Sequence, residues 1–333
     1  MGAVSLGDMA QSFMLRRHTV ALKQNLQRLT NEVATGHASD ITARVSGDLV
    51  PISGIDASLA RLKGYGSATA EAAAFTGAMQ VVLGTVDSLA SGLSTTLIAA
   101  ATGGSDAMVD LAGKDAEQKL QTVLSAFNTQ FGGRSLFAGV GTMAAAVIGA
   151  NTLLSALGVA VTGAVSAQDV EIAVTSWFAD PAGYDALAYQ GGDVLAGLTI
   201  APGEEARIDV TAKDPALRDT VKGLAMAALL NRGVLAGQST GRQDLARRAG
   251  FSLLDNKTDR TNVAAGIGLV EAQIDAAATR NASETSALQI ARNGITEADP
   301  YESATRLEDT EAQLEKIYAI TARLSHLSLL DYL

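Results

Sequence analysis

The residues that most resemble a chemical motif are Gly139-Val140-Gly141-Thr142-Met143-Ala144, which match the G-x-G-x-x-A pattern of dinucleotide-binding loops. In such loops the motif follows a β-strand and opens a helix within a βαβ unit. Here a predicted helix and Gly132-Gly133 precede it. No acidic residue stands in a second strand about 20 residues further on, where the ribose would need it. A nucleotide-binding enzyme is therefore only the weak alternative.

No other combination of reactive side chains stands out. The 333 residues include no cysteine, which excludes disulfides, Cys-based zinc sites and Cys nucleophiles. The histidines are too scattered for a metal cluster: His18, His37 and His326. Glu204-Glu205 and Glu308-Asp309 fit solvated surface charge, and Trp177-Phe178 fits a buried core. The sequence thus predicts no enzyme, no catalytic residue, no cofactor and no metal.

Charge and hydropathy exclude several partners. The net charge is −10, which argues against binding to nucleic acid or to an anionic membrane. Residues 135–168 are uncharged, but glycines interrupt them and Ala, Thr and Ser predominate, so we expect no membrane span there. The N-terminus has no basic segment followed by an apolar one, so no secretory signal peptide is expected.

The last 35 residues predict a long helix with one narrow apolar seam. Asp299 can cap its start, Pro300 suits the first helical position, and Glu302 can reach back to the cap. The apolar and small residues recur at three- and four-residue spacing, as in a coiled coil: Leu307, Leu314, Ile317, Thr321, Leu324 and Ser328. At 1.5 Å per residue, positions 301–329 would span roughly 40 Å.

The N-terminal residues carry a matching seam, and Gly36 is suited to end their helix. The seam consists of Leu15, Thr19, Leu22, Leu26, Leu29 and Val33. Residues 1–35 carry a net charge of +2 and residues 297–333 carry −5. Two separate solvated amphipathic helices remain the alternative, but the opposite charges favour pairing. Because both seams are thin, we expect the terminal helices to be poorly ordered in the free chain and to order on assembly.

The segments between the termini alternate in character. Residues 37–57 are predicted to be a loop, and 134–165 have no helical period. Helices are predicted at about 58–101, 107–131, 167–178, 217–231 and 243–293, with Gly294 ending the last. Strand-like runs occur only at 198–200 and 207–211, among turn residues.

These elements predict a mainly α fold with a smaller α+β insert. Its terminal coiled-coil helices would be 1–36 and 299–333. A helical rod domain would comprise 37–140 and 240–298, and an outer domain, 141–239, would be inserted at its middle and fold independently.

Three blocks resemble the flagellin superfamily. Leu26 to Gly36 resembles "L-x-x-L-x-x-x-(I/V)-(S/A)-(S/T)-G", and Asn128 to Gly139 resembles "N-x-x-x-x-G-x-(Y/S)-L-F-(A/G)-G". In the last helix, Asp299 to Leu307 resembles "D-x-A-x-x-x-x-x-L", and Ser325 to Leu330 resembles the terminal "x-x-L-S-L-L". With the flanking helices the resemblance covers about two-thirds of the chain.

Within that family, hook–filament junction subunits and filament subunits are the alternatives. Filament subunits usually carry an R-I-N-S-A-x-D-D-A-A-G-like run after the first helix, where this chain has His37 to Asp48. The segment with Tyr189-Gln190-Gly191-Gly192 and Ile200-Ala201-Pro202-Gly203 resembles the single outer domain of the junction subunits. The resemblance therefore favours a junction subunit.

The resemblance implies an extracellular structural subunit of the bacterial flagellum, exported by the type III system without a cleavable signal peptide. The implied partners are other copies of the chain, a neighbouring hook-associated junction protein, flagellin and a cytoplasmic export chaperone. Its terminal helices would form the inner tube layer, where neighbours would cover Phe13, Met14, Leu327 and Leu330. We expect assembly to depend on Leu15, Leu22, Leu26, Leu29, Val33, Leu307, Leu314, Ile317, Leu324, Leu327 and Leu330.

Overall fold

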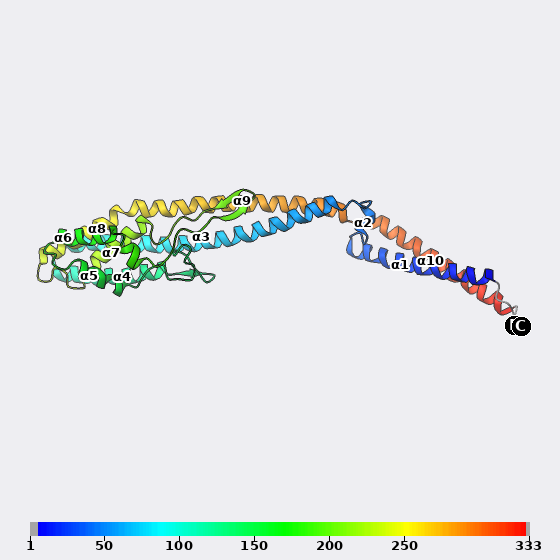
Figure 1. The fold of residues 1–333 in the computed structure, drawn as a ribbon, viewed down its shortest axis with the longest axis horizontal. Coiled ribbons are helices and arrows are strands. Elements are labelled where there is room, and N and C mark those ends of the chain that lie inside the picture. The colour runs from blue at the N-terminus through cyan, green and yellow to red at the C-terminus, as the bar shows by residue number, and fades with distance from the viewer. Residues whose placement is uncertain (1–5, 331–333) are drawn as a thin grey trace. The chain divides into compact units, whose positions relative to one another are not determined.

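The computed structural model describes residues 6–330, with side-chain surroundings for 9–323. The chain is mainly α-helical, with two short hairpins, and this fold class is as predicted (Figure 1). It divides into two compact units. Unit 1 comprises residues 1–63 and 283–333, and unit 2 comprises residues 64–282. Two long helices, α3 (Val50–Gly103) and α9 (Lys257–Thr296), each contribute residues to both units.

The terminal helices of unit 1 begin and end where their capping residues indicate. α1 (Leu6–Thr35) is followed by Gly36, which has a φ of +70° and donates its N–H to Glu32 O at 2.8 Å. α10 (Pro300–Leu330) is capped by Asp299, whose Oδ1 accepts from the amides of Tyr301 and Glu302 at 2.9 and 3.2 Å. The Glu302 carboxylate pairs with Arg306 at 2.6 Å instead of the predicted backbone cap.

Most of the predicted loop 37–57 is helical. A short helix, α2 (Ile41–Arg44), is capped by the Asp40 side chain. α3 then begins at Val50, well before the predicted position 58, because Asp48 Oδ1 accepts the Val50 amide at 3.1 Å and Pro51 suits a first turn. Pro51 therefore lies in the first turn of α3, and Gly47, at a φ of +85°, lies in the turn that follows α2.

Unit 2 has its own hydrophobic core, built where α3 meets α4 (Asp106–Phe127), α7 (Pro215–Ala228) and α8 (Ser239–Asp255). Along α3 the buried apolar side chains recur at helical spacing: Phe75, Met79, Val82, Val86, Ala90, Leu93 and Leu97. Gly250 of α8 lies so close to α3 that a Cβ there would be 2.9 Å from Ile98 Cγ1. Among the described residues α3 alone is long and apolar enough to cross a membrane, and 39% of its most apolar window is buried inside the structure.

The strands are shorter than predicted. β1 (Gln130–Phe131) and β2 (Arg134–Ser135) form a hairpin, so the helix predicted to reach residue 131 ends at Phe127. Gly132 and Gly133, at φ values of +58° and +78°, form its turn. In the second hairpin, β3 (Leu198–Ala201) pairs with β4 (Glu204–Ala206), and the strand predicted at 207–211 is irregular backbone.

The periodicity missed two helical segments and joined two others into one. α5 (Ala150–Ala160) lies within the region predicted to lack helix, and η1 (Tyr184–Ala188) is a π-helix. α6 (Ala167–Ala179) agrees with the helix predicted at 167–178, and it begins with a capping box between Ser166 and Asp169. The helix predicted at 243–293 is two helices, because the chain breaks at Asn256, and α9 continues past Gly294 to Thr296.

The two units differ from the domains drawn from the sequence. The segment 141–239 shares one continuous core with α3, α4, α8 and α9. α4 packs directly on α7, and a Cβ on Gly113 of α4 would be 3.0 Å from Leu230 Cβ. The compact unit that holds this segment therefore extends over residues 64–282.

Candidate assembly interface

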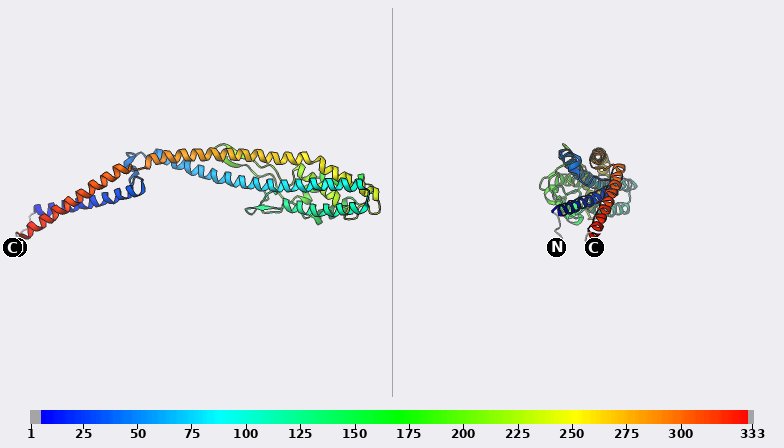
Figure 2. Two further views of the ribbon diagram at one scale, coloured as in Figure 1. Left: turned by 180° about the vertical axis from the view of Figure 1, so that it is seen from behind. Right: turned by 90° about the vertical axis from the view of Figure 1, so that its right-hand side faces the viewer.

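The two terminal helices lie side by side in unit 1. α1 (blue) and α10 (red) run antiparallel, since the residues that follow α1 pair with those that precede α10 (Figures 1 and 2). Along the pair, Asn25 Nδ2 lies 3.5 Å from Thr310 Oγ1, and Lys23 Nζ lies 5.8 Å from the ring centroid of Tyr318. The chain termini thus form one helical pair within unit 1.

Most of the predicted assembly residues face the partner helix. Leu29 is 1% exposed, and six others are half-buried: Leu15, Leu22, Leu26, Leu307, Leu314 and Ile317. Val33 is different, since it is 41% exposed while its neighbour Glu32 takes the inward position. The side chains of Leu324, Leu327 and Leu330 lie outside the described residues.

Polar residues occupy inward positions that the apolar pattern did not reveal. Glu32, Ser303 and Thr310 are 7%, 6% and 4% exposed. Thr310 Oγ1 donates to Arg306 O at 2.7 Å, which satisfies its hydroxyl within α10. Ser303, Thr310 and Ile317 stand at successive seven-residue intervals, so a heptad count that admitted small polar residues would have found them.

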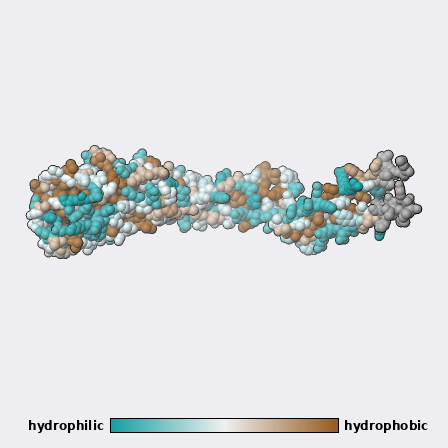
Figure 3. Space-filling model, turned by 90° about the horizontal axis from the view of Figure 1, so that it is seen from below, coloured by the Kyte–Doolittle hydropathy of each residue, from teal (hydrophilic) through white to brown (hydrophobic). Residues whose placement is uncertain are grey.

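Several large apolar side chains on the outside of the pair are exposed among the described residues. On α1, Phe13 and Met14 are 68% and 65% exposed. Met9 and Val20 of α1, and Tyr318 and Ile320 of α10, are also exposed. Brown hydrophobic and teal hydrophilic atoms alternate over the visible face in Figure 3. Met9, Phe13 and Val20 stand four and seven residues apart and so share one face of α1, and exposed apolar side chains gathered on one face are typical of a surface that binds another protein.

An open groove of about 450 Å³ also lies on α1. It is lined by His18, Ala21, Leu22, Gln24, Asn25 and Arg28. The exposed side chains of the two helices differ in charge. α1 presents Arg16, Arg17 and Lys23, and α10 presents Glu308, Asp309, Glu311 and Glu315. The exposed charges of α1 are therefore complementary in sign to those of α10.

In the dinucleotide-like segment of unit 2, the amides of Val140 and Gly141 are already engaged by carbonyl groups of the chain. The Val140 N–H donates to Asp193 O at 2.8 Å, and the Gly141 N–H donates to Ala138 O at 3.1 Å. A Cβ at Gly139, where φ is +57°, would lie 2.1 Å from Asp193 O. The glycines therefore allow two loops to pack closely. The segment also follows an antiparallel hairpin, whereas a dinucleotide-binding loop follows a parallel strand.

The other candidate groups are structural in the described part of the chain. Phe178 is buried and Trp177 packs beside it, with ring centroids 5.1 Å apart. Burial raises the pKa of the Tyr184 hydroxyl, which donates to Ala212 O at 2.9 Å. The described residues contain no group of three or more His, Cys, Asp or Glu side chains placed to hold a metal.

Comparison with known proteins bears on the C-terminal part of this interface. Residues 254–333 match the family model described as the bacterial flagellin C-terminal helical region. This part of the chain is flagellin-like. It contains all of α9 and α10, and so includes the α10 side of the helical pair. No sequence match was found among curated proteins.

The fold is also similar to a solved structure. A protein of Vibrio parahaemolyticus, provisionally named a flagellar hook-associated protein, superposes with a TM-score of 0.50 at 12% sequence identity. The similarity covers 72% of this chain and 94% of the other. At that identity it shows a shared fold.

Proposed function

We propose that the chain is a structural subunit of the bacterial flagellum, located outside the cell, that assembles through α1 and α10. The observation that carries this proposal is the pairing of a flagellin-like α10 with α1, because the pair leaves an apolar face uncovered. The face would be covered by neighbouring copies. At about 25 cal/mol per Å² of apolar area buried, such a face supplies a driving force for assembly without any catalytic group.

Within the flagellum we infer the role of the hook–filament junction subunit, hook-associated protein 3. Two sequence features support it over a filament-forming flagellin: the His37–Asp48 segment departs from the filament pattern, and the 141–239 segment is small. In this role 141–239 faces outward, and the partners are a neighbouring hook-associated junction protein and flagellin. A cytoplasmic chaperone covers α10 before export, and the chain needs no cofactor.

Deleting the gene in its own host separates the two roles. A junction subunit is expected to leave hooks without filaments while unpolymerised flagellin is secreted into the medium. Loss of flagellin itself would instead leave hooks with their junctions complete and no flagellin outside the cell. Normal filaments and motility in the deletion strain would refute both.

Complementation with point variants tests the assembly face. Phe13→Glu places a charge on the exposed apolar face, and Gln11→Glu places the same charge at an exposed polar position of the same helix. We expect Phe13→Glu to be exported but not incorporated, and Gln11→Glu to restore filaments. Equal incorporation of both variants would show that this face stays uncovered in the flagellum.

A further inference from the structure

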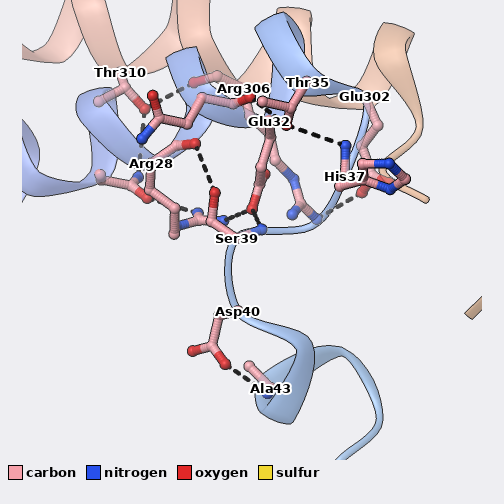
Figure 4. Close-up of polar contacts among 12 residues, drawn as sticks. Arg28, Glu32, Thr35, His37, Ser39, Asp40, Ala43, Glu302, Arg306 and Thr310 are labelled. Atoms are coloured by element: carbon pink, nitrogen blue, oxygen red, sulfur yellow. Dashed lines mark hydrogen bonds and ion pairs between the residues drawn. The ribbon is translucent and has the colours of Figure 1, made fainter. Parts of the chain in front are cut away.

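Glu32 is an almost fully buried carboxylate near the end of α1. Its side chain accepts from Arg28 Nη1 at 2.8 Å and from the backbone amide of Ser39 at 3.0 Å, both through Oε1 (Figure 4). Arg28 Nη2 in turn donates to Asn25 Oδ1 at 2.7 Å. Asn25 is the residue that approaches Thr310 on α10, so the network extends from the helical pair to the segment that leaves α1.

The segment captured by Glu32 folds back along α1 after Gly36. Ser39 makes a second contact with the helix, since its Oγ donates to Arg28 O at 3.3 Å. The residue before it, Ala38, donates its N–H to Thr296 O at 2.8 Å, and the Ala298 N–H donates to Gly36 O at 2.9 Å. Adjacent residues are therefore held by two different partners, with Ala38 on the α9–α10 junction and Ser39 on α1.

We propose that Glu32 is a positioning residue, a latch that fixes the direction in which the chain leaves α1. By holding Ser39 it presents residues 36–38 to the α9–α10 junction, and so keeps α1 and α10 in one register. The latch is a property of unit 1 alone. Its importance for incorporation into the flagellum rests on the proposed function.

The geometry distinguishes a latch from an ordinary helical ion pair. An exposed i,i+4 pair such as Glu302–Arg306, with side chains 56% and 62% exposed, contributes little to stability. The Glu32 side chain is 8% exposed and carries a second, backbone, donor. Removing the buried Glu32 acceptor breaks both hydrogen bonds at once, which costs more than losing one solvated pair.

The first test uses the full chain and two variants of similar size. Glu32→Gln keeps a side-chain oxygen that can accept from Ser39, whereas Glu32→Met fills the same space without an acceptor. Amide hydrogen exchange of Ala38, Ser39 and Ala298 is measured by NMR in the free chain. We expect Glu32→Met to accelerate exchange by about tenfold or more, and Glu32→Gln to stay within about threefold of the native rate.

A charge exchange provides the second test. Arg28→Glu/Glu32→Arg preserves the net charge and an i,i+4 ion pair, but places a group without an acceptor opposite Ser39. The matched control is Glu302→Arg/Arg306→Glu on the exposed face of α10. We expect fast exchange at Ser39 in the first variant and native exchange in the control.

Equal exchange in Glu32→Met and Glu32→Gln, or native exchange at Ser39 in the Arg28→Glu/Glu32→Arg variant, would overturn the latch. Because these rates are measured in the free chain, they do not depend on the flagellar role. Failure of that role would appear only in the deletion strain. If both proposals hold, Glu32→Met is incorporated less well than Glu32→Gln.

Discussion

Truncating Leu29 to Ala tests whether the α1·α10 pair is held by its inward apolar side chains. Leu29 is 1% exposed, and the substitution removes most of a buried side chain from the contact with α10. Leu→Ala substitutions at buried sites cost about 2–5 kcal/mol. A helical pair that is open to solvent on its outer face can partly collapse around the lost volume, so we expect about 2–3 kcal/mol.

That cost corresponds to an increase of about 30- to 150-fold in the equilibrium constant for opening α1. Amide hydrogen exchange in the free chain measures this constant residue by residue when reclosing is fast. Val33→Ala is the control, since Val33 lies on the same helix and is 41% exposed. We expect the Leu29→Ala variant to accelerate exchange throughout 15–33 by up to that factor, limited by the small protection that a weakly ordered pair gives in the free chain, and the control to remain within about threefold of native.

The core of unit 2 serves as an internal reference. The hydrophobic core of unit 2 contains no residue of α1 or α10. The amides of its α3 part, from Phe75 to Leu97, are therefore expected to exchange at native rates in both variants. Two results would refute the reasoning. One is equal acceleration by Leu29→Ala and Val33→Ala. The other is equal acceleration in α1 and in unit 2, which would mean that the whole chain opens as one cooperative structure.

Three further predictions concern the stability of unit 2. Asp87→Ala is expected to destabilise the unit by about 1–3 kcal/mol in chemical denaturation, because it leaves the buried Arg260 guanidinium, 2.9 Å away, without its carboxylate. The Ser166 hydroxyl and nearby backbone amides lower the pKa of Asp169 below its usual 3.8, so its stabilising contribution is present above pH 3.8 and is lost as pH falls through the lowered value. Asp169→Asn should remove that part of the pH dependence of Tm. Residues 64–282 expressed alone are expected to unfold in one cooperative transition. The fragment 141–239 alone should be less stable, because its helix α7 loses the contact with α4. Equal stability of the two fragments would favour the domain boundary predicted from the sequence.

Helix ends were predictable wherever a single residue type determines them. Gly36 ends α1 because it adopts a positive φ, and Asp299 with Pro300 starts α10, as their positions before and after the seams indicate. Local chemistry of this kind needs no knowledge of the tertiary structure. It also explains why the mainly α fold class could be predicted from the sequence.

Elements determined by tertiary contacts could not be predicted in this way. The break at Asn256 is invisible in the periodicity, because it depends on the Asn256 side chain donating to Ala216 O at 2.7 Å and to Thr220 Oγ1 at 2.9 Å. α5 was missed since its glycine and small residues obscure the helical period, yet Leu153, Leu154 and Leu157 are buried in the core of unit 2. In both cases another element of the core supplies the deciding interaction.

In the candidate interface, too, the local sequence pattern located some residues and tertiary contacts determined others. The three-and-four spacing located most of the inward residues of α1, but it assigned Val33 to the interface where the structure has Glu32. Leu29 and Glu32 are the buried residues at this end of α1, a step of three residues, where the predicted seam took a step of four from Leu29 to Val33. The shorter step brings a carboxylate inward, and the Ser39 amide and Arg28 guanidinium satisfy it there.

The inward polar residues also bear on the proposed assembly of the terminal pair with further copies. Glu32, Ser303 and Thr310 occupy positions that in a self-sufficient pair would be apolar, while Phe13 and Met14 remain on the outer face. Polar positions in a seam fix register and lower the stability of the pair itself. The apolar area that remains is buried only when another copy covers it, so the free energy that orders α1 and α10 would come in part from assembly. We therefore expect the terminal pair to be weakly associated while the chain is free and to become rigid once neighbouring copies are in place.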